Sequence, residues 1–527
     1  MDLIIKDATV IDGSGAPGFQ ADLGLNGDCI EFVGQLSNVP SAAVMQAGGR
    51  VVCPGFIDIH SHSDYHLLIN PRSESKIRQG VTTEVGGNCG YAAAPIGNQA
   101  LEERQGHYKE NFDLELDWKT LPEYRRRLEK AELSVNYAPL IGHNTIRATV
   151  MGMENRPPTS RELTQMAALT EEAMQEGAFG ISSGLPYPPA CYARAPELIA
   201  LCKAAAGYGG FLSCHIRSEG PRLLEALDEI ILVAREARIP LQISHLKTAG
   251  SANWHKLPQA FEKIEKAQAQ GAPITADRYP YLASNAGLQA LLPDWAFEGG
   301  KEAQLRRLQD QSTRRQLQKE ILANHPEAKY WEKILISEAV SEENQQWVGL
   351  TVAEAAVRDA KSPLEFVFDL LLQEGMQVEA LYFIMSEKNL LEILSKPYVM
   401  IGSDSACRAH CGPLCKGRPH PRAFGTFPRV LGHYVNKEGV LTLEEAVHKM
   451  TGAPAQKLGF KDRGLIRQGF KADIVIFDPR KITDTATYQN PASYPEGIDC
   501  VIVNGAITLE NGSHTGIGKG RVLAKGN

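Results

Sequence analysis

The sequence has no long hydrophobic run and no cluster of basic residues. No apolar stretch approaches the roughly 20 residues needed to span a bilayer, and the net charge of the 527 residues is -7 at pH 7. These absences argue against a membrane-spanning chain and against nucleic acid or an anionic membrane as a partner. The first residues also lack the basic and then apolar pattern of an export signal, so we expect a cytoplasmic location.

Two further absences narrow the class of protein. No Gly-x-Gly-x-x-Gly and no phosphate loop follows a predicted strand, so the usual marks of a nucleotide-binding fold are missing. The ten cysteines are scattered along the chain, and without an export signal we expect them to be reduced thiols. With 43% hydrophobic and 22% charged residues, the composition is that of an ordinary globular protein.

The two ends of the chain have the pattern of short strands joined by tight turns. Asn26-Gly27 and Asn504-Gly505 each separate two apolar runs, which is a strong signal of a β-hairpin. Because both ends share this pattern and the middle does not, we expect residues 1–52 and 466–527 to form one small β-sandwich-like domain.

The middle of the chain, residues 53–465, alternates predicted strands with amphipathic helical patterns. Eight repeats of strand and then helix favour a (β/α)8 TIM-like barrel over an open α/β sheet, which could hold as many strands. A charged segment at about 286–345 is too long for a plain connection, and we expect a helical insertion there, acting either as a lid or only in packing. The eight strands are predicted at residues 56–60, 81–86, 135–142, 179–182, 211–215, 240–245, 273–277 and 399–404.

The polar residues at the predicted strand ends are the candidates for chemistry, because barrel active sites lie at the carboxyl ends of strands. Each candidate alone has a structural explanation, as a core histidine, a buried cysteine or a helix cap. Their joint occurrence at strand ends instead predicts a site for one or two divalent metals, and N, O and S donors suit zinc. These candidate ligands are His60, His62, Cys89, His215, His245 and Asp404.

Longer motifs around these residues resemble the amidohydrolase superfamily and, within it, the D-aminoacylase (N-acyl-D-amino-acid deacylase) family. The resemblance covers essentially the whole chain. Many binuclear amidohydrolases bridge their metals with a carboxylated lysine on strand four, but no lysine lies there in this chain. Cys89 instead matches the cysteine that D-aminoacylases place after strand two. The matching segments are residues 54–62, 86–90, 181–187, 214–217, 244–247, 279–281, 402–404, 420–429, 451–455 and 464–473.

This resemblance implies a zinc-dependent hydrolase that converts an N-acyl-D-amino acid to a carboxylate and a free D-amino acid. It implies that Cys89, His215 and His245 hold a tighter metal, and that a second, weaker site uses His60, His62 and Asp404. The metal would activate water and hold the oxyanion, while Asp404 would act as general base and then general acid. The family's substrate-binding positions are matched by Lys247, Arg422, Tyr187 and Tyr279, and more weakly by Ser284.

Alternatives remain open for both the activity and the loop at residues 405–419. The chain could instead hydrolyse cyclic amides or peptides with a C-terminal D-residue, or be a non-catalytic scaffold of amidohydrolase descent. Arg408 could contact an acidic substrate side chain or simply be a solvated charge. We expect unpaired thiols rather than a metal knuckle in this loop, because the spacing lacks a second Cys/His pair. The loop residues concerned are Cys407, His410, Cys411 and Cys415.

Overall fold

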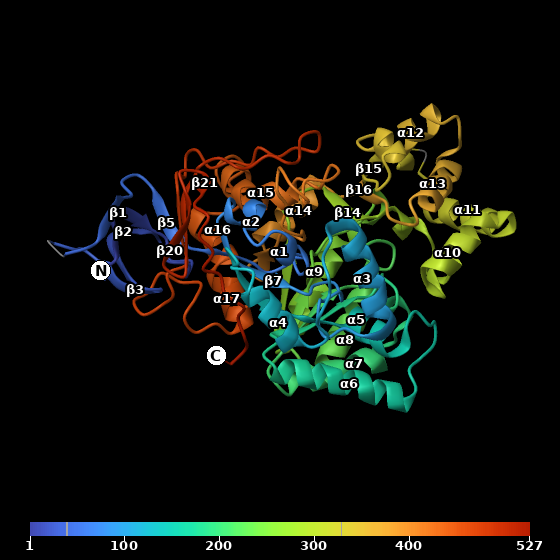
Figure 1. Ribbon diagram of the computed structural model, residues 1–527, viewed down its shortest axis with the longest axis horizontal. Coiled ribbons are helices and arrows are strands. Elements are labelled where there is room, and N and C mark those ends of the chain that lie inside the picture. The colour runs from blue at the N-terminus through green and yellow to red at the C-terminus, as the bar shows by residue number, and fades with distance from the viewer. Residues whose placement is uncertain (38–39, 328, 527) are drawn as a thin grey trace.

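The computed structural model describes residues 1–37, 40–327 and 329–526 (Figure 1). Among these residues, eight strands run parallel around a ring in chain order. The last strand meets the first where the Asp404 amide donates to the His60 carbonyl at 2.8 Å and Ser61 bridges to Ser405. The (β/α)8 barrel is therefore confirmed. Its strands are β6 (Phe56–Asp58), β7 (Val81–Gly86), β8 (Asn136–Pro139) continued as β9 (Ile141–Gly142), β10 (Gly180–Gly184), β11 (Phe211–His215), β12 (Leu241–Ile243), β13 (Ile274–Arg278) and β17 (Val399–Ile401).

Amphipathic helices surround these strands, and their apolar faces join the strands in one large core. Helix α6 shows how the local sequence determines where a helix begins and ends. Thr159 and Glu162 form a capping box at its start, and Gly177 adopts a positive φ just past its end, as both patterns require. Successive helices α5 to α9 pack side by side around the barrel. The helices are α1 (His66–Ile69), α2 (Glu74–Ile77), α3 (Asn98–Phe112), α4 (Leu121–Glu129), α5 (His143–Met151), α6 (Ser160–Gln175), α7 (Ala195–Ala206), α8 (Leu223–Ala237), α9 (Leu257–Ala269), α14 (Glu387–Ser395), α15 (Arg422–Arg429), α16 (Leu443–Met450) and α17 (Gly452–Leu458).

The two ends of the chain form one continuous sheet beside the barrel, at the left of Figure 1. Strand β5 joins the halves, since it pairs with β1 on one side and with β18 on the other. Both expected hairpins are present, at Asn26–Cys29 and at Val503–Ala506. The strands are β1 (Leu3–Val10), β2 (Phe19–Asn26), β3 (Cys29–Gly34), β4 (Ala43–Gln46), β5 (Val51–Pro54), β18 (Ile474–Phe477), β19 (Ile498–Val503), β20 (Ala506–Glu510) and β21 (Ser513–His514).

An insertion after the seventh barrel strand lies at the opposite end of the molecule from the N-terminal strands (Figure 1). It contains a three-stranded antiparallel sheet and has its own apolar core. The unit begins at residue 283 and closes at residue 383, beyond the expected range of 286–345. The sheet continues past residue 345 because its central strand β16 pairs with both β14 and β15. Its elements are β14 (Ala283–Gly287), α10 (Gly300–Gln309), α11 (Gln311–Asn324), β15 (Ile334–Glu338), α12 (Val352–Arg358), α13 (Pro363–Gln373) and β16 (Glu379–Phe383).

These pairings support a division of the chain into three units. We propose a terminal β unit, a barrel, and the insertion at residues 283–383, with the first boundary just after β5 rather than at residue 52.

Among the described residues, no helix has the length and apolar character needed to cross a bilayer.

Candidate metal centre and substrate cavity

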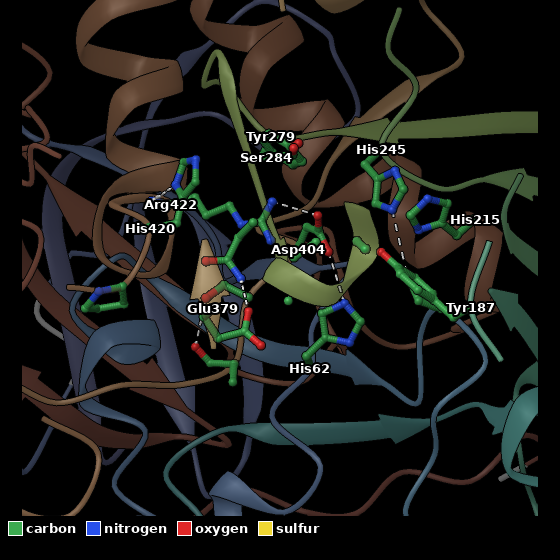
Figure 2. Close-up of a pocket in the computed structure, with 18 of the residues that line it drawn as sticks. His62, Tyr187, His215, His245, Tyr279, Ser284, Glu379, Asp404, His420 and Arg422 are labelled. Atoms are coloured by element: carbon green, nitrogen blue, oxygen red, sulfur yellow. Dashed lines mark hydrogen bonds and ion pairs between the residues drawn. The ribbon is translucent and has the colours of Figure 1, made fainter. Parts of the chain in front are cut away.

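A cavity of about 440 Å³ opens at the carboxyl ends of the barrel strands (Figure 2). Part of its wall comes from the insertion, through β14 and Glu379 on β16. In Figure 2, Arg422 and Glu379 lie on one side of Asp404, and His215 and His245 lie on the other. The insertion is therefore part of the site itself, whether or not it moves as a lid.

The donor atoms of all six strand-end candidates come together, and all but His60 line the cavity. Their donor atoms form two groups, each lying within 4.8 Å, and Cys89 belongs to both. The Cys89 Sγ lies 3.3 Å from His60 Nε2 and 3.6 Å from His245 Nε2. The Asp404 Oδ1 lies 3.0 Å from His62 Nε2. The first group is His60, His62, Cys89 and Asp404, and the second is Cys89, His215 and His245.

Three of these residues hold an uncommon backbone conformation. Cys89, His245 and Asp404 have φ angles of 50°, 35° and 51°, a left-handed region that non-glycine residues seldom occupy. Such conformations persist where the surrounding structure imposes them, often at functional sites. A close approach also shapes the floor, because a Cβ at Gly402 would lie 2.6 Å from the His60 Cβ.

The charges of the site favour an ionised thiolate and carboxylate. Burial would raise the pKa of Cys89, but the charge of His60 and hydrogen bonds from the surrounding histidines hold it well below its usual value. Burial would likewise raise the pKa of Asp404, yet the Arg422 guanidinium and the nearby His245 hold it well below its ordinary range. Thiolate, imidazole and carboxylate are the donors that zinc prefers, so this donor set fits a zinc centre.

Two carboxylates that the sequence prediction missed stand behind the histidines. Asp277 Oδ1 lies 3.1 Å from His60 Nδ1, and Glu219 Oε1 lies 2.8 Å from His245 Nδ1. A carboxylate on one ring nitrogen orients the ring and leaves the other nitrogen for a metal. Asp277 ends the seventh predicted strand, so its position was a usable signal. Glu219 follows strand five by four residues, and only the folded loop brings it to His245.

A buried ion-pair network lies beneath the centre and was also not predicted. Lys76 Nζ donates to Asp58 Oδ2 at 2.7 Å and to Ser403 Oγ at 2.8 Å, and it lies 3.3 Å from Glu84 Oε2. The Asp58 carboxylate accepts hydrogen bonds from the backbone amides of His60 and Ser403. This network ties the first barrel strand to the last directly behind the candidate ligands.

The predicted substrate-binding residues all line the cavity. Arg422, at the start of α15, lies over the Tyr279 ring at 4.6 Å. Its Nη1 forms an ion pair with Asp404 Oδ2 at 2.7 Å, whereas Nε makes no hydrogen bond with any described residue. Lys247 contacts the Glu219 carboxylate, so its charge is already partly matched. Tyr187 packs edge-to-face against His215, with ring centroids 5.0 Å apart, and Ser284 lies on β14.

The loop at residues 405–419 contributes Ser405, Ala406, Arg408 and Pro419 to the cavity wall. Arg408 lines the cavity, and its Nη2 lies 3.5 Å from Glu338 Oε2. The three loop cysteines form no disulfide. Among the described residues, neither group that could hold a metal includes them or His410, whose Nδ1 lies 2.8 Å from the Tyr494 hydroxyl.

Known proteins resemble this chain along most of its length. The model of the "Amidohydrolase family" matches residues 43–509. The chain is 36% identical to a D-aminoacylase of Alcaligenes xylosoxydans xylosoxydans, covering 99% of this chain and 98% of the relative. It is 34% identical to an N-acyl-D-aspartate deacylase of the same organism, covering 100% and 95%.

A solved structure extends this likeness to three dimensions. The crystal structure of N-acyl-D-glutamate deacylase from Bordetella bronchiseptica, in complex with zinc and a phosphonate inhibitor that mimics the tetrahedral intermediate, has a TM-score of 0.84 to this chain. The two are 31% identical, and the match covers 99% of each chain. The barrel, the shared-cysteine donor set and these matches lead to one conclusion: the chain belongs to the amidohydrolase family, in its D-aminoacylase group.

Proposed function

We propose that this protein is a zinc-dependent hydrolase of N-acyl-D-amino acids, releasing a carboxylate and a free D-amino acid. One observation carries the proposal. A single cavity combines the Cys89-centred donor set with the buried Arg422, whose Nε makes no hydrogen bond among the described residues. A metal centre beside a buried guanidinium suits an amide substrate that bears a free α-carboxylate.

The residues that would hold zinc are the two groups that share Cys89. Zinc bound there would supply Lewis acidity toward the carbonyl oxygen and toward water. We propose that the Cys89, His215 and His245 group binds more tightly, as the resemblance to D-aminoacylases implies. The group with His60, His62 and Asp404 would be the weaker one. Asp277 and Glu219 would keep the His60 and His245 rings in place.

Asp404 is the proposed proton carrier. Its carboxylate is ionised and lies between His62 and Arg422, at 3.0 Å and 2.7 Å. It would accept the proton of the attacking water and then return it to the leaving amine nitrogen. Arg422 would orient the substrate through the α-carboxylate, and Tyr187, Tyr279, Lys247 and Ser284 would complete the pocket.

The test compares zinc-loaded enzyme on paired N-acetyl-D- and N-acetyl-L-amino acids with acidic, aliphatic, aromatic and amide side chains. We expect hydrolysis of D-substrates with little or no turnover of the L-series. Asp404→Asn should lower kcat by about a thousandfold or more, as removal of a central proton carrier does, while zinc remains at the group with Cys89, His215 and His245. Absence of turnover for every D-substrate would refute the proposal.

A parallel assay addresses the alternative of a cyclic-amide hydrolase. A ring amide carries no free α-carboxylate, so it would leave Arg422 without an anionic partner. We therefore expect hydantoins and dihydropyrimidines to be poor substrates for the same enzyme preparation. A cytoplasmic location and a lack of nucleic-acid or membrane partners remain predictions from the sequence.

A further inference from the structure

The insertion places two carboxylates opposite each other at the edge of the substrate cavity. Glu338 on β15 and Glu379 on β16 are direct neighbours across an antiparallel pair. Like charges in this arrangement disfavour the pairing. The net charge at this edge of the cavity therefore depends on which other charged groups lie near the two carboxylates.

The two carboxylates have different partners. Glu338 lies 3.5 Å from Arg408, so this guanidinium is already paired with a carboxylate. Glu379 Oε2 accepts a hydrogen bond from Asn285 Nδ2 at 2.8 Å. Within the part of the chain that the structure describes, Glu379 makes no ion pair. When both carboxylates are ionised, Glu338, Glu379 and Arg408 together carry one net negative charge.

Glu379 also faces space that a substrate side chain could fill. The neighbouring wall is built from small residues of the insertion, and Arg422 lies on the same side of Asp404 in Figure 2. Burial, and then the charge of Glu338, raises the pKa of Glu379 to about 7, although the hydrogen bond from Asn285 and the charges of Arg408 and Arg422 lower it. The small wall residues are Ser284, Ala286, Gly287 and Ala290.

We propose that Glu379 and Asn285 form the subsite that binds the substrate side chain. This subsite favours D-amino acids whose side chains carry an N–H donor over those whose side chains carry a carboxylate. The inference rests on the proposed function, with the substrate α-carboxylate at Arg422. An amide or amino group would supply the unmatched Glu379 with a hydrogen bond or a positive charge. An acidic side chain would meet a like charge, which opposes binding.

The experiment uses two substrates of nearly equal shape, N-acetyl-D-glutamine and N-acetyl-D-glutamate. For the zinc-loaded full chain at pH 8, we expect kcat/KM to favour the glutamine substrate by about tenfold or more. Glu379→Gln should shrink this ratio by about tenfold. Glu343→Gln, which changes an exposed carboxylate of the same insertion, should leave it unchanged.

A pH series provides a second readout of the same ratio. The effects of pH on the metal centre apply to both substrates and cancel, and the substrate carboxylates stay ionised between pH 6 and 9. The glutamine preference should therefore fall as the pH drops through 7 in the unaltered protein, and stay flat in Glu379→Gln. Equal or faster hydrolysis of the glutamate substrate, or a ratio that Glu379→Gln does not alter, would overturn the inference and leave the proposed function standing. Hydrolysis of neither these nor any other D-substrate would overturn both.

Discussion

Asp404 and Arg422 form an ion pair on the cavity wall, with Oδ2 and Nη1 2.7 Å apart. The proposed proton carrier is thus in contact with the proposed binder of the α-carboxylate. Arg422→Gln should lower kcat/KM for N-acetyl-D-amino acids by about a hundredfold, since a charged hydrogen bond contributes up to about 3 kcal/mol. The steady-state comparison should include the α-carboxamide analogue, whose hydrolysis should change much less because it lacks the carboxylate.

Arg429→Gln is the matched control for that substitution. Arg429 ends the same helix and pairs with Asp484 at 3.1 Å, outside the residues that line the cavity. Its loss should leave discrimination between carboxylate and carboxamide unchanged. An equal effect of Arg422→Gln on the carboxylate and carboxamide substrates would show that Arg422 does not bind the α-carboxylate.

The shared position of Cys89 predicts an asymmetry between ligand substitutions. His62→Ala removes a donor from one group only, so bound zinc should fall toward one equivalent per chain while the other group stays filled. Cys89→Ser should lower zinc at both groups, because it replaces the donor that they share. Metal content after dialysis, measured by atomic emission, distinguishes these outcomes.

Cys411→Ser controls for the general loss of a thiol. Cys411 is exposed and free, and it lies outside both donor groups, so zinc content should be unaffected. Loss of all zinc in His62→Ala would contradict the assignment of two groups with different affinities.

The buried Lys76 network predicts a large stability effect. Lys76, Asp58 and Glu84 have no exposed side-chain surface. Lys76→Met would leave two carboxylates in the interior without their cation, which typically costs about 3–5 kcal/mol. The urea midpoint of the variant should fall clearly. Lys109→Met, which removes a surface pair with Asp113, should move the midpoint little, and equal shifts in the two variants would refute the role of the network.

Lys449 predicts a distinct dependence of stability on pH. Its side chain is buried, with Nζ donating to the Val399 carbonyl at 3.0 Å, and burial lowers its pKa from 10.5 to about 8. Between pH 8 and 10.5 the folded state therefore binds fewer protons than the unfolded state. Stability should rise with pH in this window, by at most about 1.4 kcal/mol per pH unit.

Thermal unfolding of the unaltered protein and of Lys449→Met between pH 8 and 10.5 tests this. Other groups titrate in both proteins, so the difference between the two curves isolates Lys449. The unaltered protein should gain stability relative to the variant as the pH rises. Parallel curves would show that burial does not lower the pKa of Lys449 in the folded protein.

Local patterns in the sequence were sufficient for the barrel and for the position of the candidate centre. Strand periodicity, the Asn-Gly turns and the capping box at Thr159 each involve residues close together in the chain. Parallel strands in a barrel necessarily bring their carboxyl ends to one face. Six polar residues at strand ends could thus be expected to meet, and the structure brings them together.

Contacts between distant segments decided the rest. The insertion extends to residue 383 because Gly287 pairs with Glu379, 92 residues later, and no local period reports such a pairing. The same pairing brings Glu379 to the cavity, where its burial and its nearness to Glu338 affect the charge that a substrate would meet. Glu219 and Lys76 likewise acquire their partners only on folding. Backbone periodicity is a property of residues that are close in the chain. The environment of a charged group depends on every segment packed around it, so only the tertiary structure specifies the charges and pKa values at this site.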